Sequence, residues 1–227
     1  MNTTSKHFLT AIFQQLGQIK LDTTAGQTST TAGHDSKLAS LKGRAAGQAK
    51  SSMMTLHFLF PHELLRALDL LDRKLVKMFR CQRANNEAKP LEVFYIQTAS
   101  AVTESVNRRS ANSRYRNVWT ATKVHYEVRL DSWNCTCAAF AQSQLKLLLG
   151  RNRNDQASMG SRSSEAAQAE CLIGGMATKP NSLIPICKHI LAAAFASAAP
   201  NLFATGVQSK EVSKEEMAAW AAGWGEN

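Results

Sequence analysis

Two pairs of metal-binding residue types stand out in this chain of 227 residues. Cys135 and Cys137 lie one residue apart in the stretch SWNCTCAAF. Cys187 and His189 have the same spacing in PICKHILAA. Together they form a Cys3His set, a standard donor set for a tetrahedral structural zinc ion. Residues i and i+2 of a strand project to one face, so an extended Cys-x-Cys can direct both sulfurs toward one ion.

The second pair lies where a helix is expected to begin. A helix N-terminus has free N–H groups and partial positive charge, so it favours the thiolate form of Cys187. Simple packing is the alternative, because free cysteine is among the most buried residue types. Two pairs with the same short gap, each at the boundary of an element, favour a Zn2+ site over packing. Cys81 and Cys171 are expected to take no part, and His125 is the best substitute ligand.

Catalysis at such a site is not expected. Four protein ligands complete the tetrahedral shell of zinc, whereas catalytic zinc keeps an open position. The sequence offers no glutamate beside the motif to act as a base, no Gly-rich phosphate loop and no serine nucleophile elbow. We therefore predict that the protein is not an enzyme and that the metal has a structural role.

Charge and composition narrow the class of protein and its location. The formal net charge is +10 and the pI is near 9.6, which favours contact with nucleic acid or another acidic partner. The chain has five cysteines, and its N-terminal apolar run is too short for a secretory signal. A reducing compartment is therefore expected, where closely spaced cysteines favour metal binding over disulfides. No apolar stretch is long enough to span a bilayer.

The elements that must position these residues are predicted from periodicity. Alternation predicts strands over 91–98 and 123–130, and the turn DSWN then places the first cysteine pair at the end of a hairpin. Helical spacing predicts five helices. They cover 8–19, 61–79, 145–149, 187–199 and a C-terminal helix capped by Ser213 and Glu216. Trp220 and Trp224, four residues apart in the last helix, are expected to fold back onto the core.

The predicted fold class is α+β, with a small antiparallel sheet and flanking helices. Residues 1–55 are expected to form an N-terminal helix and a flexible linker, since 22–37 is rich in Thr, Gly and Ser and the chain stays small and basic to Lys50. The α+β domain then covers 56–205, with a polar insertion at 150–183. Residues 206–227 form a C-terminal helical tail.

The pattern C-x-C…C-x-H resembles the SWIM-type zinc finger, a ββα unit. HYEVRLDSWNCTCAAF is similar to the family's strand, turn and first ligand pair, including Phe140, and PICKHILAA to its second pair. The extension through Ala192 is similar to the SWIM subunits of the fungal and animal Shu complex. The resemblance covers about 57–205, with its specific motifs in 123–196. One departure is the 49-residue gap between the pairs, interpreted as a looped-out excursion.

The resemblance implies Cys135, Cys137, Cys187 and His189 as zinc ligands and Ala192 as a small packing position. It also implies a nuclear accessory factor in homologous recombination. Such a factor pairs with a RecA-like recombinase paralogue and supports the recombinase filament on single-stranded DNA.

Two alternatives to this function stay open. In the first, a zinc module binds nucleic acid directly through four arginines of an expected basic hairpin loop: Arg108, Arg109, Arg114 and Arg116. Arg151 and Arg153 are further candidates. Phosphate contacts of this kind would make binding fall steeply with salt. The second alternative is a ubiquitin-pathway adaptor, which the absence of a RING-like cysteine array disfavours.

Overall fold

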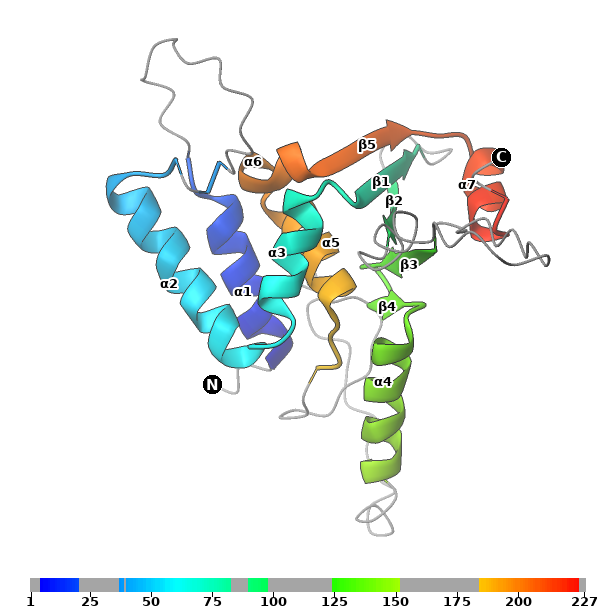
Figure 1. Ribbon diagram of the computed structural model, residues 1–227, viewed down its shortest axis with the longest axis horizontal. Coiled ribbons are helices and arrows are strands. Elements are labelled where there is room, and N and C mark those ends of the chain that lie inside the picture. Colours follow the sequence, from blue (N-terminus) through cyan, green and yellow to red (C-terminus); the bar gives the residue numbers. More distant parts are fainter. Residues whose placement is uncertain are drawn as a thin grey trace, which may run out of the picture.

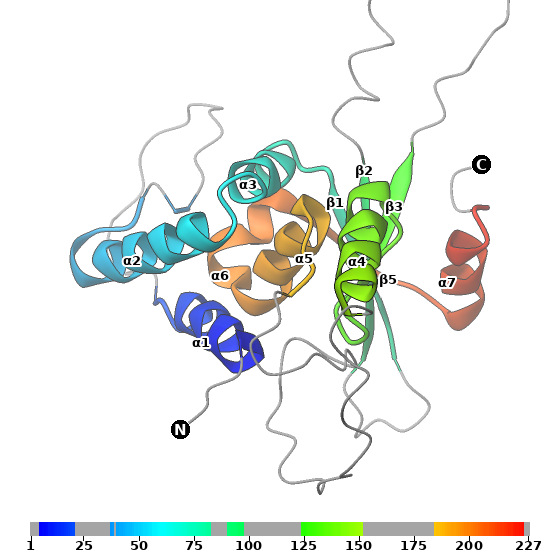
Figure 2. The ribbon, with the colours of Figure 1, turned by 90° about the horizontal axis from the view of Figure 1, so that it is seen from below.

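The protein has an α+β fold, as the sequence predicted, in which one sheet lies between a single C-terminal helix and a group of other helices (Figures 1 and 2). The computed structural model describes residues 5–20, 37–38, 40–82, 90–97, 124–151 and 184–224. Several predicted features lie outside these ranges. They are the expected linker up to residue 36, the four arginines of the basic loop, Arg153 and Cys171. Every helix of the described part is too short or too polar to cross a membrane.

In the described part of the chain the sheet has five strands, in the order β4-β3-β2-β1-β5. Their bounds are Val76–Cys81 (β1), Leu91–Gln97 (β2), His125–Arg129 (β3), Asn134–Cys135 (β4) and Val207–Glu211 (β5). Neighbouring strands are antiparallel except β1 and β5, which are parallel. The predicted strands at 91–98 and 123–130 are confirmed, and the turn between β3 and β4 falls on the DSWN stretch.

The helices are Ser5–Gly17 (α1), Gly43–Leu59 (α2), Leu64–Asp72 (α3), Ala138–Arg151 (α4), Lys188–Ala198 (α5), Pro200–Phe203 (α6) and Lys214–Ala221 (α7). Figure 2 shows α7 on one side of the sheet and α1, α2, α3 and α5 on the other. Alternate residues of the strands face these two groups, as the period of two in a strand requires. Phe94 and Val128 face the larger core, and Phe79 and Tyr95 face α7.

Helix α5 is the centre of the larger core. Its residues from His189 to Ala196 are all buried, and four of them are alanines. These small side chains let neighbouring elements approach closely. On α1, a Cβ added to Gly17 would lie 2.2 Å from the backbone oxygen of Ala198 at the end of α5. The predicted N-terminal helix therefore packs against the same core as the sheet.

The helix predicted over 61–79 is wrong beyond Asp72. The chain leaves α3 through Lys74, which has a left-handed φ of 55°. The amide of Lys74 donates to the oxygen of Leu71, and the amide of Leu75 donates to the oxygen of Leu70. This pair of bonds is a Schellman motif, which ends a helix. The following residues pair with β2 and β5, and this tertiary pairing overrides the helical spacing of the apolar residues.

Helix α2 lies where the sequence indicated a small, basic linker. Residues 43–50 are helical, and the predicted boundary at residue 55 falls inside this helix. Helix α4 also begins earlier than predicted, at Ala138 rather than Leu145.

The helix capped by Ser213 is confirmed, with the Ser213 hydroxyl accepting a hydrogen bond from the amide of Glu216. The predicted helical tail over 206–227 is wrong at Val207–Glu211, because these residues pair with β1 as strand β5. Trp220 contacts the rings of Phe79 and Tyr95, as predicted. The expectation for Trp224 is wrong, because its side chain is 75% exposed.

Candidate metal centre

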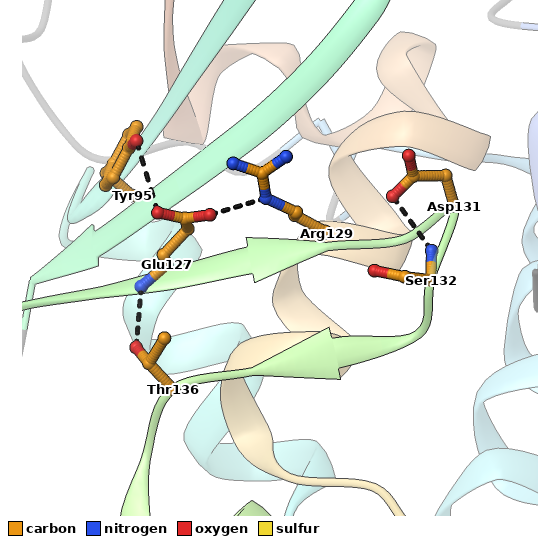
Figure 3. Close-up of polar contacts among 6 residues, drawn as sticks. All are labelled: Tyr95, Glu127, Arg129, Asp131, Ser132 and Thr136. Atoms are coloured by element: carbon orange, nitrogen blue, oxygen red, sulfur yellow. Dashed lines mark hydrogen bonds and ion pairs between the residues drawn. The ribbon is translucent and has the colours of Figure 1, made fainter. Parts of the chain in front are cut away.

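The β3–β4 hairpin positions the first cysteine pair. Cys135 lies opposite Val128 in the register of β3 and β4. Thr136, between the two cysteines, makes two hydrogen bonds with Glu127. The Thr136 Oγ1 accepts from the backbone amide of Glu127, and the backbone amide of Thr136 donates to the backbone carbonyl oxygen of Glu127. Figure 3 shows Thr136 held against β3 in this way. Cys135 and Cys137 are both buried while Thr136 is exposed, as alternation along an extended chain predicts.

Two of the cysteines directly precede helices. Cys137 lies before α4: its carbonyl oxygen accepts from the amide of Ala141, and its Sγ accepts from the amide of Phe140 at 3.4 Å. Cys187 is the N-cap of α5, with extended backbone angles. Sulfurs at these positions benefit from the partial positive charge of a helix N-terminus, which favours the thiolate. The sequence predicted this effect for Cys187 alone, because α4 was expected to begin later.

The four predicted ligands come together in one buried cluster. Their donor atoms lie within 4.8 Å of one another. The Nδ1 atom of His189 is 3.8 Å from the Cys135 sulfur and 4.0 Å from the Cys187 sulfur. Bond lengths of about 2.3 Å to sulfur and about 2.0 Å to nitrogen place tetrahedral zinc ligands roughly 3.5 to 3.8 Å apart. The two distances from His189 are therefore about 0.3 to 0.5 Å longer than in a tetrahedral zinc site. The four residues are close enough together that they could hold a metal ion.

The closeness of the three thiols opposes their joint ionisation and outweighs the effect of the helix N-terminus at Cys187. The hydrogen bond with Cys137, a second one with Cys187 and burial raise the pKa of Cys135. Hydrogen bonds with Cys135 and Cys187 lower the pKa of Cys137. For Cys187, the hydrogen bond with Cys135 lowers the pKa, whereas the hydrogen bond with Cys137 and burial raise it. The raising effects are larger, so the pKa of Cys187 rises to about 12. Like charges this close disfavour joint ionisation, whereas a bound divalent cation deprotonates its thiol ligands.

The imidazole of His189 is oriented by packing. The side chain is 3% exposed, and the ring of Tyr126 on β3 lies against it with centroids 4.7 Å apart. With Nδ1 directed at the sulfurs, Nε2 carries the hydrogen in a metal-bound neutral ring. This Nε2 is buried and has no hydrogen-bond partner among the described residues. The metal would therefore be bound by a histidine held through ring contacts.

Trp133 is a residue of the site that was not predicted from the sequence. This residue is fully buried, and its indole Nε1 donates a hydrogen bond of 2.9 Å to the carbonyl oxygen of Pro185. The bond joins the turn before Cys135 to the segment before Cys187, so it links the two ligand pairs. Trp133 has a φ of 50°, which an L-residue rarely adopts. Its position two residues before Cys135 was the feature of the sequence that could have indicated a role in the site.

The remaining candidates fall on both sides of the sheet. Phe140 and Ala192 are buried in the larger core beside the cluster, as the packing roles predicted for them require. Cys81 lies in β1 on the face toward α7, and the ring of His125 contacts Trp220 on that same face. Neither belongs to the metal cluster.

The outer face of the hairpin carries a polar network (Figure 3). Glu127 accepts from the Nε of Arg129 at 2.5 Å and from the hydroxyl of Tyr95 at 3.4 Å. Burial, followed by the charge of Glu127, raises the pKa of Tyr95 to about 12. In the turn, Asp131 accepts from the amide of Ser132. This network fixes the hairpin on the face opposite the metal cluster.

Comparison with known proteins gives no assignment: no family model matches the chain, and no curated protein matches it.

Proposed function

We propose that this chain is a zinc-binding, non-enzymatic accessory factor of homologous recombination in the nucleus. It pairs with a RecA-like recombinase paralogue in a Shu-type complex and promotes assembly of the recombinase filament on single-stranded DNA. The observation that carries the proposal is the buried Cys3His cluster, which has the residue types and order of the SWIM resemblance. The recombination role itself rests on that resemblance.

The geometry supports a structural metal. Two ligands come from the hairpin and its exit, and two come from the start of α5, which is the centre of the core. All four donors are buried, so substrate would have no access to the ion. A Zn2+ ion held there would cross-link sheet and helix and would stabilise the fold, because the ligands converge only when the chain is folded.

The proposal is tested by purifying the chain from its own cells and identifying its partners by mass spectrometry. We expect about one zinc per chain and a RecA-like paralogue in stoichiometric amount. Cys187→Ser should lose both, while Cys81→Ser, a buried cysteine on the other face of the sheet, should keep both. Zinc-loaded chain that brings down no RecA-like protein would overturn the recombination role and leave the metal site standing.

Direct nucleic-acid binding is the second candidate. The net charge of +10 favours it, and a surface pocket is lined by three basic residues: Lys20, Lys42 and Arg44. If this candidate holds, the isolated chain binds single-stranded DNA with an affinity that falls steeply between 50 and about 200 mM salt. An isolated chain that shows no salt-dependent DNA binding would eliminate it.

A further inference from the structure

Helix α2 has two different faces. The face toward the core consists of its buried residues: Ala49, Ser52 and Leu56. Each residue of a helix is turned by about 100° from the one before it. Residues separated by four, three and four positions therefore share the side of α2 that is opposite the core. This row, the outward stripe, consists of exposed residues: Gly47, Ser51, Met54 and Phe58. The spacing is that of a helix seam that packs against another helix.

The C-terminal half of the outward stripe is strongly apolar. Phe58 is 81% exposed, the most of any large apolar side chain in the described part of the chain, and Met54, one turn earlier, is 49% exposed. Leu65 in the first turn of α3 is 64% exposed. Large apolar side chains that share one face mark an interaction site more often than scattered single ones do, and Met54 and Phe58 share the outward face of α2.

The N-terminal half of the stripe is small and basic. A Cβ built on Gly47 meets no described atom within 4 Å, so a partner backbone has room to approach. Helix α2 contains Arg44 and Lys50 but no aspartate or glutamate, and Lys42 directly precedes it. The complementary partner is therefore acidic where it faces this half. The α2 helix of a second copy would offer no carboxylate to these basic residues, because the helix contains no aspartate or glutamate.

We propose that the outward stripe docks an amphipathic helix with acidic side chains beside its apolar face, supplied by the RecA-like paralogue. The identity of the partner rests on the proposed function; the chemistry of the docked helix follows from α2. Apolar residues of that helix cover Met54 and Phe58, and its carboxylates face Arg44 and Lys50. Nucleic acid would pair with the basic residues but would leave Phe58 and Met54 uncovered.

The test compares three variants co-expressed with the paralogue that is recovered with the wild-type chain. Gly47→Leu adds bulk where the fold has space and raises helix propensity, so it blocks approach without unfolding the chain. The double variant Met54→Ser, Phe58→Ser removes the exposed apolar end. Leu145→Ser on α4, which is 55% exposed, is the matched control.

We expect Gly47→Leu and the double variant to lower recovery of the paralogue by about tenfold or more, with zinc content unchanged. Gly47→Leu should not lower the melting temperature, and Leu145→Ser should have no effect on recovery. Full recovery with both α2 variants would overturn this inference and leave the proposed function intact. Conversion of a dimer of this chain to a monomer by Gly47→Leu would also overturn it, by assigning the stripe to a second copy. A wild-type chain that recovers no RecA-like protein would overturn both proposals.

Discussion

Trp133→Phe tests whether one hydrogen bond holds the two halves of the metal cluster together. The indole Nε1 of Trp133 and the carbonyl oxygen of Pro185 are 2.9 Å apart and buried. Phenylalanine keeps an aromatic ring in the same turn but has no donor. The Pro185 oxygen is then left without its partner inside the protein.

The size of the effect follows from two contributions. A buried acceptor without a donor costs about 1–3 kcal/mol. The smaller ring also leaves a void larger than a methyl group, which costs about 1 kcal/mol. The expected loss is therefore roughly 2–4 kcal/mol, and since a chain of this size loses about 2–4 °C in melting temperature per kcal/mol, Tm should fall by roughly 5–15 °C.

Thermal unfolding of the zinc-loaded protein, followed by circular dichroism, measures this loss. A chelator titration should also remove zinc from Trp133→Phe at a lower chelator concentration, by about tenfold for each 1.4 kcal/mol. Trp224→Phe is the matched control, because Trp224 is 75% exposed and its replacement should change neither value. Equal melting temperatures and equal chelator midpoints for the two variants would refute the role assigned to Trp133.

Three further predictions address the cluster and the sheet. Cys187→Ser should abolish zinc binding and expose the chain to proteolysis, and Cys81→Ser should do neither; equal zinc content in both variants would contradict the ligand assignment. Ala192→Leu should destabilise the protein by about 1–3 kcal/mol in urea unfolding, because Ala192 is fully buried in a packed core; an unchanged urea midpoint would show that the helix has free space. Tyr95 has a pKa raised to about 12 in the folded state, so its contribution to stability is complete below the ordinary tyrosine pKa near 10 and is lost as the pH rises toward 12. Tyr95→Phe should flatten the loss of stability between about pH 10 and 12, and an identical alkaline profile would argue against the raised pKa.

Local chemistry made the cluster predictable from the sequence. Each ligand pair spans three residues, so strand alternation and a helix start are enough to aim its donor atoms. Bringing the pairs together depends on the hairpin and α5, whose elements were also predicted. The bond from Trp133 to Pro185 joins residues 52 apart, and no local pattern encodes such a contact.

The errors arose where tertiary contacts decide the structure. Residues 76–81 continue the helical spacing of α3, but they pair between two other strands, which the periodicity could not reveal. Helix α2 has apolar or small residues on both its inward and its outward side, so it lacks the single apolar stripe by which a surface helix is recognised.

The central claim is that Cys135, Cys137, Cys187 and His189 bind one zinc ion that joins the hairpin to α5. X-ray absorption spectroscopy of the purified protein, with metal content measured on the same sample, tests this claim most directly. The account predicts about one zinc per chain, with three sulfurs at about 2.3 Å and one nitrogen at about 2.0 Å. A stably folded chain free of metal, or a zinc shell of other donors, would contradict it.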